Sequence, residues 1–350
     1  MGNDHSDLYS GEKEHDQISL MIDYYGKFKG KKNTNLISAS LWQLDGLDYY
    51  RINYLKETRI TGLLFAEFHS LSRNRINDFD YLLYPEYWGG GVGYKSSNNT
   101  FIQAGIKKKV SKETHCIEYM LIITSSIFTR SYDYGSLRTH LIHEYFFSKL
   151  VLRSRIFAQY GYGKSWPFES VLYLSDNDKA SFMADGFTRA RGFIPQTCLG
   201  YGLISRHFQY GGGLNLRGYS GYIASDVNED GTIIPVYYGK SGAAVNMELE
   251  FNKIFQSQNP NHDHFFNVKT YLFSDIGVIN SNEFDNKLLF SKIRIDAGIG
   301  MALNIQQWGL FDRIKPLTVR IDFPLFLNRP PAIEPNYFNF RWIFGLKRAF

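Results

Sequence analysis

The stretch KIRIDAGIGMALNI, from Lys292 to Ile305, alternates apolar residues with polar or small ones over its whole length. Every second residue from Ile293 onward is apolar, and the intervening positions include Arg294 and Asp296. Successive side chains of a β-strand point to opposite faces of a sheet, so this pattern predicts a long strand with one apolar face. The opposite face carries charges of both signs.

Other segments repeat this alternation and favour a membrane barrel over a soluble sheet. A soluble sandwich also has one apolar and one polar face, so a single strand does not separate the two. Several long strands with ionisable residues on the polar face favour a barrel, whose outer surface contacts lipid while its inner surface faces a wet lumen. The C-terminal segments that show the pattern are Val245–Phe251, Phe266–Val278, Lys292–Ile305 and Leu317–Leu325.

The N-terminal half carries weaker versions of the same pattern. Taken together, the segments predict an all-β protein, a transmembrane antiparallel β-barrel of about 16 strands, since bacterial barrels have an even number. We expect the barrel to occupy residues 17–350, after a polar segment at residues 1–16. The strands expected in this half are Gln17–Phe28, Leu36–Gln43, Tyr49–Leu55, Thr61–Phe68, Trp88–Lys95, Phe101–Val110, Cys116–Phe128, His140–Phe147 and Val151–Gly161.

The composition fits a barrel and argues against several other classes. Aromatic residues make up 17% of the chain, yet the mean hydropathy is only -0.29. No apolar run reaches the length of about 18 residues that a transmembrane helix needs. The net charge of +5 comes from Lys and Arg interleaved with acids, so no nucleic-acid partner is expected. The two cysteines, Cys116 and Cys198, are too far apart for a metal-site spacing.

The two ends of the chain carry different signals. Residues 1–16 have neither the basic nor the apolar region of a signal peptide, so we expect a signal peptide and any periplasmic part to lie outside this chain. At the other end we expect a final strand at Phe338–Phe350. Its aromatic residues resemble the C-terminal signal that barrel assembly machinery recognises, and they are Phe340, Trp342, Phe344 and Phe350.

One long segment, Ser165–Ser241, lacks sustained alternation. Long segments of this kind in a barrel are extracellular loops or loops folded into the lumen. The segment contains the motif GGGLNLRGY, in which a single arginine stands among glycines that permit close backbone approach. A flexible glycine loop is the simpler interpretation of composition alone. The residues of interest in the motif are Gly212, Gly213, Leu216, Arg217, Gly218 and Tyr219.

A second motif, FSDIG, begins at Phe273 and lies within an expected strand. The alternation places Asp275 on the lumen face together with Phe273 and Gly277. A carboxylate on this face and the guanidinium of Arg217 can form a bidentate pair. We therefore predict that this pair tethers the long loop inside the barrel.

The two motifs resemble the Leu/Val-Arg-Gly-Tyr/Phe motif of the sixth loop and the Phe-x-Asp-x-Gly strand motif of the outer-membrane assembly factor superfamily, also called the bacterial surface antigen family. Arg217 corresponds to the loop arginine of this family, and Asp275 corresponds to the strand aspartate that the arginine contacts. The resemblance covers roughly residues 208–350. Further matches follow in the family's order at Gly242–Phe251, Ala297–Gly300, Ile321–Pro324 and Phe350.

The resemblance implies a function at the outer membrane. The family includes barrel insertases, two-partner secretion transporters and organellar import barrels. By this resemblance the chain inserts or translocates proteins, contacts outer-membrane lipid, and has client proteins or accessory lipoproteins as partners. An insertase would use a weak seam between its first and last strands, because an unpaired edge templates new strands.

Two alternatives remain open at this stage. Typical family members carry POTRA domains before the barrel, and none is visible in this sequence. The barrel can therefore be an anchor or exporter for a fused N-terminal enzyme domain, which the sequence preceding Met1 would decide. It can also be a porin-like channel, in which case Arg217→Ala would leave its activity unchanged.

No other motif predicts catalysis or a cofactor. Asp226–Gly231 is similar to the first half of a calcium loop, but Tyr237 stands where the closing acid is expected. His140 and Glu144 would share one face of a strand while His143 points the other way, which is not a zinc motif. We expect no enzymatic activity, no cofactor and no metal.

Overall fold

The computed structural model describes strands and short connections over most of the chain. The described residues are 20–29, 34–44, 47–58, 62–73, 97–127, 132–167, 170–175, 177–178, 181, 207–220, 226–227, 233–234, 238–251, 266–280, 290–305, 317–330 and 336–350. Within these residues, no helix is both long enough and apolar enough to cross a bilayer.

Long strands make up the wall of the molecule and confirm the all-β prediction. In the N-terminal half they are β1 (Leu20–Lys29), β2 (Thr34–Leu44), β3 (Leu47–Thr58), β4 (Gly62–Arg73), β5 (Ser97–Ser111), β6 (His115–Ser126), β7 (Asp133–Phe146) and β8 (Val151–Ser165). In the C-terminal half they are β14 (Gly242–Glu250), β15 (Phe266–Ile279), β16 (Arg294–Ile305) and β17 (Leu317–Leu327), followed by the short β18 (Ile343–Leu346).

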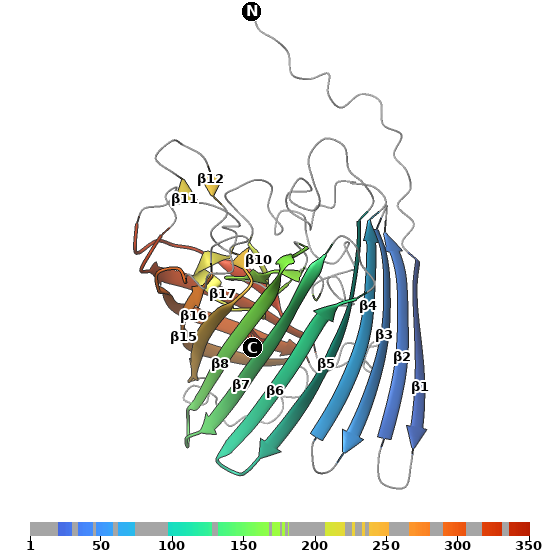
Figure 1. Cartoon of the computed structure of the whole chain (residues 1–350). Helices are drawn as coiled ribbons and strands as arrows, with labels where there is room; N and C mark the ends of the chain where they lie inside the picture. The colour runs from blue at the N-terminus through green and yellow to red at the C-terminus, as the bar shows by residue number, and fades with distance from the viewer. Residues whose placement is uncertain are drawn as a thin grey trace, which may run out of the picture.

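These strands form one continuous sheet. Each strand from β1 to β8 pairs antiparallel with the next, β8 pairs with β14 across the long loop, and the order continues to β18. Figure 1 shows β1 to β8 as a row of tilted strands, with β15 to β17 turning back behind them, so the sheet is curved. Among the described residues, no pairing joins β1 to β18, and these two strands lie at opposite ends of the antiparallel order.

The edge of β18 that faces away from β17 is covered by a piece of the long loop. This piece is β10 (Phe208–Tyr210), which pairs with β18 in parallel, whereas the other neighbours in the large sheet pair antiparallel. The pairing is supported by the imidazole of His207, which stacks on Trp342 with ring centroids 3.9 Å apart. The large sheet therefore has fourteen strands in the described residues, and the predicted count of about 16 is not confirmed.

The two faces of the sheet differ in chemistry in the way the alternation predicts. On the convex face, large apolar side chains at every second position are exposed, with Ile123 and Ile156 each 54% exposed. On the concave face the corresponding positions are buried and many are ionisable. The buried polar side chains of this face include Asn53, His69, Arg155, Asn246, Glu248, Asp275, Asp296, Arg320 and Asp322.

Most of the predicted strands are present, with shifted ends. The largest shift is in β7, which begins seven residues before the predicted start because Tyr134, Gly135 and Ser136 pair with β8 or pack against the loop. The predicted strand Trp88–Lys95 lies outside the described residues. The segment 165–241, predicted to be a long loop, contains the short strands β9 (Leu172–Tyr173), β10, β11 (Asp226–Val227), β12 (Ile233–Ile234) and β13 (Tyr238–Gly239).

The predicted final strand Phe338–Phe350 is wrong in extent, because β18 comprises only Ile343–Leu346. On its N-terminal side the ladder with β17 stops after the pair formed by Asp322 and Ile343. The next residue but one in β17 is Pro324, which has no N–H to donate to a ladder, and the register of β17 shifts at this point. Proline and bulge together explain the interrupted pairing.

On the C-terminal side the chain leaves the sheet at Lys347, whose φ is +68°. Beyond this turn the guanidinium of Arg348 donates to Glu248 at 2.5 Å and to Glu250 at 2.7 Å. Both glutamates lie on β14, which is separated from β18 by three strands, so Arg348 crosses the concave side of the sheet. The ion pairs of Arg348 with two buried carboxylates thus hold the last residues on the concave side of the sheet, apart from its strands.

The predicted aromatic face of the last strand is consequently split. Phe340 is 70% exposed and lies beside Phe323 of β17, with ring centroids 5.7 Å apart. Trp342 stacks on His207, and Phe344 contacts Phe208 of β10. The ring of Phe350 lies inside the sheet, 5.1 Å from the guanidinium carbon of Arg153.

Candidate functional site

The segment that carries the glycine-rich motif is bound to the inside of the sheet. Its backbone runs beside residues 172–174, because Leu214 N–H donates to the carbonyl of Tyr173 and Leu216 N–H donates to that of Leu174. Leu214 and Leu216 are fully buried in an apolar cluster between the loop and the wall. The members of this cluster are Phe157, Leu172, Leu174, Leu214, Leu216, Tyr219, Ala244, Ile279 and Leu327.

The backbone of the motif needs glycine at particular positions. Gly212 and Gly213 have φ of +134° and +54°, which side chains rarely allow. Asn215 also has a positive φ, 58°, a conformation that asparagine tolerates better than most residues. The chain then forms a short 3-10 turn, η5 (Arg217–Tyr219), that lies against β16 and β17.

Arg217 is the centre of the site. Its Nε donates to Asp275 Oδ2 at 2.8 Å and its Nη2 donates to Asp275 Oδ1 at 3.0 Å, so the pair is bidentate. Its Nη1 donates to Glu248 Oε1 at 2.8 Å, and the guanidinium carbon lies 3.8 Å from the ring centroid of Phe273. The arginine is fully buried. The ion pair predicted between the loop and strand β15 is therefore present.

The surrounding charges keep this guanidinium protonated. Burial alone would lower the pKa of Arg217, but the carboxylates of Asp275, Glu248 and Asp322 raise that pKa well above its ordinary value. The nearest oxygen of Asp322 is 3.9 Å from Nη1. Arg217 is thus a permanent cation among three carboxylates. Glu248 is also paired with Arg348 and Asp322 with Arg320, so removal of Arg217 would leave the buried carboxylate of Asp275 without its arginine.

The residues on either side of Arg217 add further contacts between the loop and the wall. Gly218 N–H donates to Asp296 Oδ2 at 2.9 Å, and the hydroxyl of Tyr219 donates to Asn328 Oδ1 at 3.2 Å. Asn246 Nδ2 donates to Asp275 Oδ1 at 3.0 Å and to the carbonyls of Leu214 and Asn215 at 3.2 Å. Side chains from four neighbouring strands or their ends therefore hold one turn of the loop.

The structure brings together nearly all the site residues predicted in the two internal motifs. Leu216, Arg217, Gly218 and Tyr219 form the turn, while Phe273 and Asp275 face it from β15. Gly277 leaves room for the loop, since a Cβ there would lie 2.8 Å from Leu216 Cδ1. Gly212 and Gly213 lie in the adjoining part of the loop and line a cavity beside it. The terminal aromatics, by contrast, are spread over the outside, the β10 edge and the inside.

Sequence reasoning missed several members of the network. Glu248 and Asp296 each contact the loop turn directly, but neither was singled out. The signal that could have found them is the alternation itself, because both lie on the same inward-facing set of positions as Asp275. The register adds to this signal, since Asp275 is directly opposite Asp296 on β16 and opposite Asn246 on β14.

The other sequence candidates lie apart from this site. His140 and Glu144 are on the inward-facing positions of β7, whereas the imidazole of His143 contacts the outward-facing Tyr145. In the acidic loop, Asp226 pairs with Ile234, and the oxygen-bearing residues after Val227 lie outside the described residues. Within the part of the chain that the structure describes, no group of three or more His, Cys, Asp or Glu is arranged to hold a metal.

The close fit at Gly218 gives a first prediction. A Cβ at this position would lie 2.3 Å from Leu327 Cδ2 and 2.7 Å from Asp296 Cβ. We expect Gly218→Val to displace the turn from β16 and to expose the loop to protease, with an overpacking cost of about 1–3 kcal/mol. Limited proteolysis and thermal unfolding measure the two effects. The matched control is Ser220→Ala, since the Ser220 hydroxyl has no hydrogen-bond partner in the described residues. Equal rates of proteolysis in the two variants would contradict the prediction.

Comparison with known proteins gives matches only at the level of structure. No family model matches the chain, and no curated protein matches it. The chain is similar to the crystal structure of BamA from Haemophilus ducreyi lacking POTRA domains 1–3, with 14% identity, a TM-score of 0.48, and coverage of 94% of this chain and 62% of that one. It is also similar to CdiB from Acinetobacter baumannii, with 11% identity, a TM-score of 0.35, and coverage of 94% and 58%. This chain therefore spans less than two thirds of the length of either protein.

Proposed function

We propose that this chain is the outer-membrane β-barrel of an assembly-factor-type protein, which inserts or translocates client proteins at the outer membrane. The observation that carries this proposal is the buried pair formed by Arg217 and Asp275. A passive pore has no need for an arginine that fixes a long loop inside its lumen. The sequence resemblance to the assembly factor superfamily rests on the same two residues.

The chemistry of the convex face supports the membrane location. Exposed Ile, Leu, Tyr, Met and Val side chains recur at alternate positions on the convex face from β2 to β16. Soluble monomers rarely expose contiguous apolar patches larger than a few hundred Å². A lipid bilayer is the environment in which such a face is stable, while the polar concave face suits a lumen.

The edges of the sheet suggest how the barrel would act. In the proposed mechanism a client strand pairs transiently at a seam between β1 and β18, because a strand edge presents unpaired N–H and C=O groups. The edge of β18 is covered by β10 in this structure, so β10 would have to leave before another strand could pair there. The seam is the point at which this proposal differs from that of a simple channel.

A reconstitution experiment tests the proposed function. The protein is placed in phospholipid vesicles, an unfolded barrel protein is added from urea, and the appearance of folded, protease-resistant client is followed with time. We expect client folding to be faster than in empty vesicles. Ion conductance across a planar bilayer is measured in parallel. Conductance without faster client folding, unchanged in Arg217→Ala, would favour the porin-like alternative and contradict the proposal.

The proposed membrane location gives a second prediction, at Ile156 on the convex face of β8. In a bilayer, Ile156→Arg is expected to lower the free energy of unfolding by about 2–4 kcal/mol, the cost of a lipid-facing arginine near mid-depth. In water the same exposed substitution would change it by less than about 0.5 kcal/mol. Urea unfolding in vesicles measures the difference, with Ile156→Val as the control. A near-zero effect of the arginine would show that this face does not contact lipid.

A further inference from the structure

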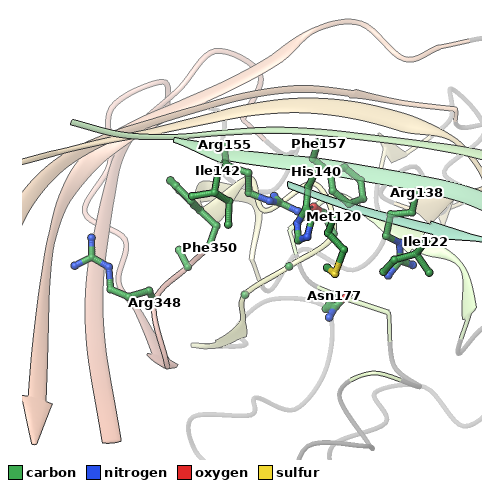
Figure 2. Close-up of a pocket in the computed structure, with 14 residues that line it drawn as sticks. Met120, Ile122, Arg138, His140, Ile142, Arg155, Phe157, Asn177, Arg348 and Phe350 are labelled. Atoms are coloured by element: carbon green, nitrogen blue, oxygen red, sulfur yellow. The ribbon is translucent and has the colours of Figure 1, made fainter. Parts of the chain in front are cut away.

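A separate cavity lies between the loop and strands β6 to β8. It has a volume of about 230 Å³. One side is formed by inward-facing residues of the wall, and Gly211–Gly213 with Asn177 form the side contributed by the loop. Figure 2 shows Arg138, His140 and Arg155 projecting from the wall toward this space, and Met120 and Phe157 beside them.

The basic side chains come from two neighbouring strands in fixed register. His140 of β7 is opposite Phe157 of β8. Arg155 lies two residues before Phe157 on the same face of β8, opposite Ile142 of β7. Arg138 is two residues from His140 on the same face of β7. The spacing is therefore set by the ladder and not by flexible loops.

Two of these groups lack the partners that buried polar groups of their kind usually have. The described contacts of Arg155 are with neutral oxygens, since it donates to Asn246 Oδ1 at 2.9 Å and to the carbonyl of Gly213 at 2.7 Å. His140 Nε2 is buried and has no hydrogen-bond partner in the described residues. A buried guanidinium that is hydrogen-bonded only to neutral oxygens and a buried ring nitrogen without a partner both cost free energy that a bound acceptor would offset.

The nearby acid only partly balances this charge. Arg138 donates to Gln159 at 2.9 Å and to Asp178 at the longer distance of 3.3 Å. Arg348 also lines the cavity, but Figure 2 shows its side chain apart from Arg138, His140 and Arg155. Its guanidinium donates instead to Glu248 and Glu250. The cavity thus presents two guanidinium groups and one imidazole against a single contacting carboxylate, Asp178.

From this arrangement we propose that the cavity binds a small oxyanion of the phosphate class, with Arg138, His140 and Arg155 as its ligands. Guanidinium groups bind phosphate oxygens through paired N–H donors, and a neutral imidazole can donate from Nε2. The oxyanion is a solute from the lumen and not a lipid headgroup, because the cavity is on the concave side whereas lipid would contact the convex face. This site does not depend on the proposed insertase role.

Calorimetric titration with inorganic phosphate tests the site. The whole chain is kept in detergent micelles at constant ionic strength, with chloride as the balancing anion. We expect one saturable phosphate site, with binding weakened about tenfold or more in Arg138→Gln and in His140→Gln, the loss typical of one hydrogen bond to a charged group. Arg138→Lys retains the charge and is expected to recover part of the affinity. Arg155 is left intact because it also supports Gly213.

The control is Arg51→Gln, which removes a guanidinium from the same concave face at β3, where Arg51 is paired with Glu67 at 2.6 Å. Phosphate affinity in this variant is expected to equal that of the parent protein, and thermal unfolding verifies that each variant is folded. Absence of saturable binding, or equal weakening in all three glutamine variants, would overturn the proposal. Competition by short-chain phosphatidic acid but not by glycerol 3-phosphate would overturn the assignment to a lumen solute.

Discussion

Replacing Arg217 with alanine is expected to release the loop from the inside of the sheet and to slow client insertion strongly. The substitution removes the two side-chain hydrogen bonds to Asp275 and the one to Glu248, and it leaves the buried carboxylate of Asp275 without its arginine. Breaking a buried pair by removing one partner costs about 3–5 kcal/mol. The hydrogen bonds of Gly218, Tyr219 and Asn246 and the apolar cluster around Leu214 remain, but none of them compensates the charge of Asp275.

Two measurements check this prediction. Limited proteolysis reports whether residues 207–220 have become accessible, and the vesicle assay reports the rate of client folding, expected to fall at least about tenfold for a loss of more than 1.4 kcal/mol. Arg51→Ala is the matched control, because Arg51 also faces inward and is paired with a glutamate, Glu67. Client folding at the parental rate in Arg217→Ala would contradict both the role of the Arg217–Asp275 pair and the proposed function.

The two internal motifs show why the alternation predicted this site so well. A strand has only two faces, so the neighbours of Asp275 in the sequence fixed the side on which its carboxylate lies. A buried arginine in the long loop, Arg217, requires an acidic partner, and Asp275 is an acidic residue on the lumen face. Glu248, Asp296 and Asp322 escaped notice because their proximity depends on register between strands, which a single sequence does not specify.

The end of the chain shows where such reasoning fails. The residues from Phe338 to Phe350 alternate well enough to predict one strand, but Pro324 lies on the neighbouring strand and interrupts the ladder from there. Likewise, nothing in the local pattern indicates that Arg348 will pair with Glu248 and Glu250, which lie 100 and 98 residues earlier in the sequence. Long-range ion pairs override strand propensity here.

The parallel pairing of β10 with β18 also could not be predicted from the sequence. Phe208–Tyr210 is only three residues long and has no alternation to identify it. Its position is determined by contacts that the rest of the fold provides. Phe344 N–H donates to the carbonyl of His207 at 2.5 Å, and Arg320 donates to the side chain of Gln209 at 2.5 Å.

A disulfide between β10 and β18 is therefore expected to stop client insertion reversibly. Phe208 and Phe344 are register partners with ring centroids 6.1 Å apart, so cysteines at these two positions lie within reach of each other. Cys116 and Cys198 are first replaced by serine to prevent other bridges. When oxidised, the protein keeps β10 on the edge of β18, and no client strand can pair there. The vesicle assay should show a loss of client folding that reduction restores.

The control disulfide joins Met301→Cys of β16 to Ile321→Cys of β17, two register partners within the wall. It adds a crosslink of the same kind but leaves the β18 edge unchanged, so client folding should be the same before and after reduction. Thermal unfolding of each reduced protein separates the effect of the crosslink from that of losing Phe208, which is fully buried. If the oxidised β10–β18 protein inserts clients as fast as its reduced form, the edge of β18 is not where a client pairs, and the cap formed by β10 has no part in the reaction.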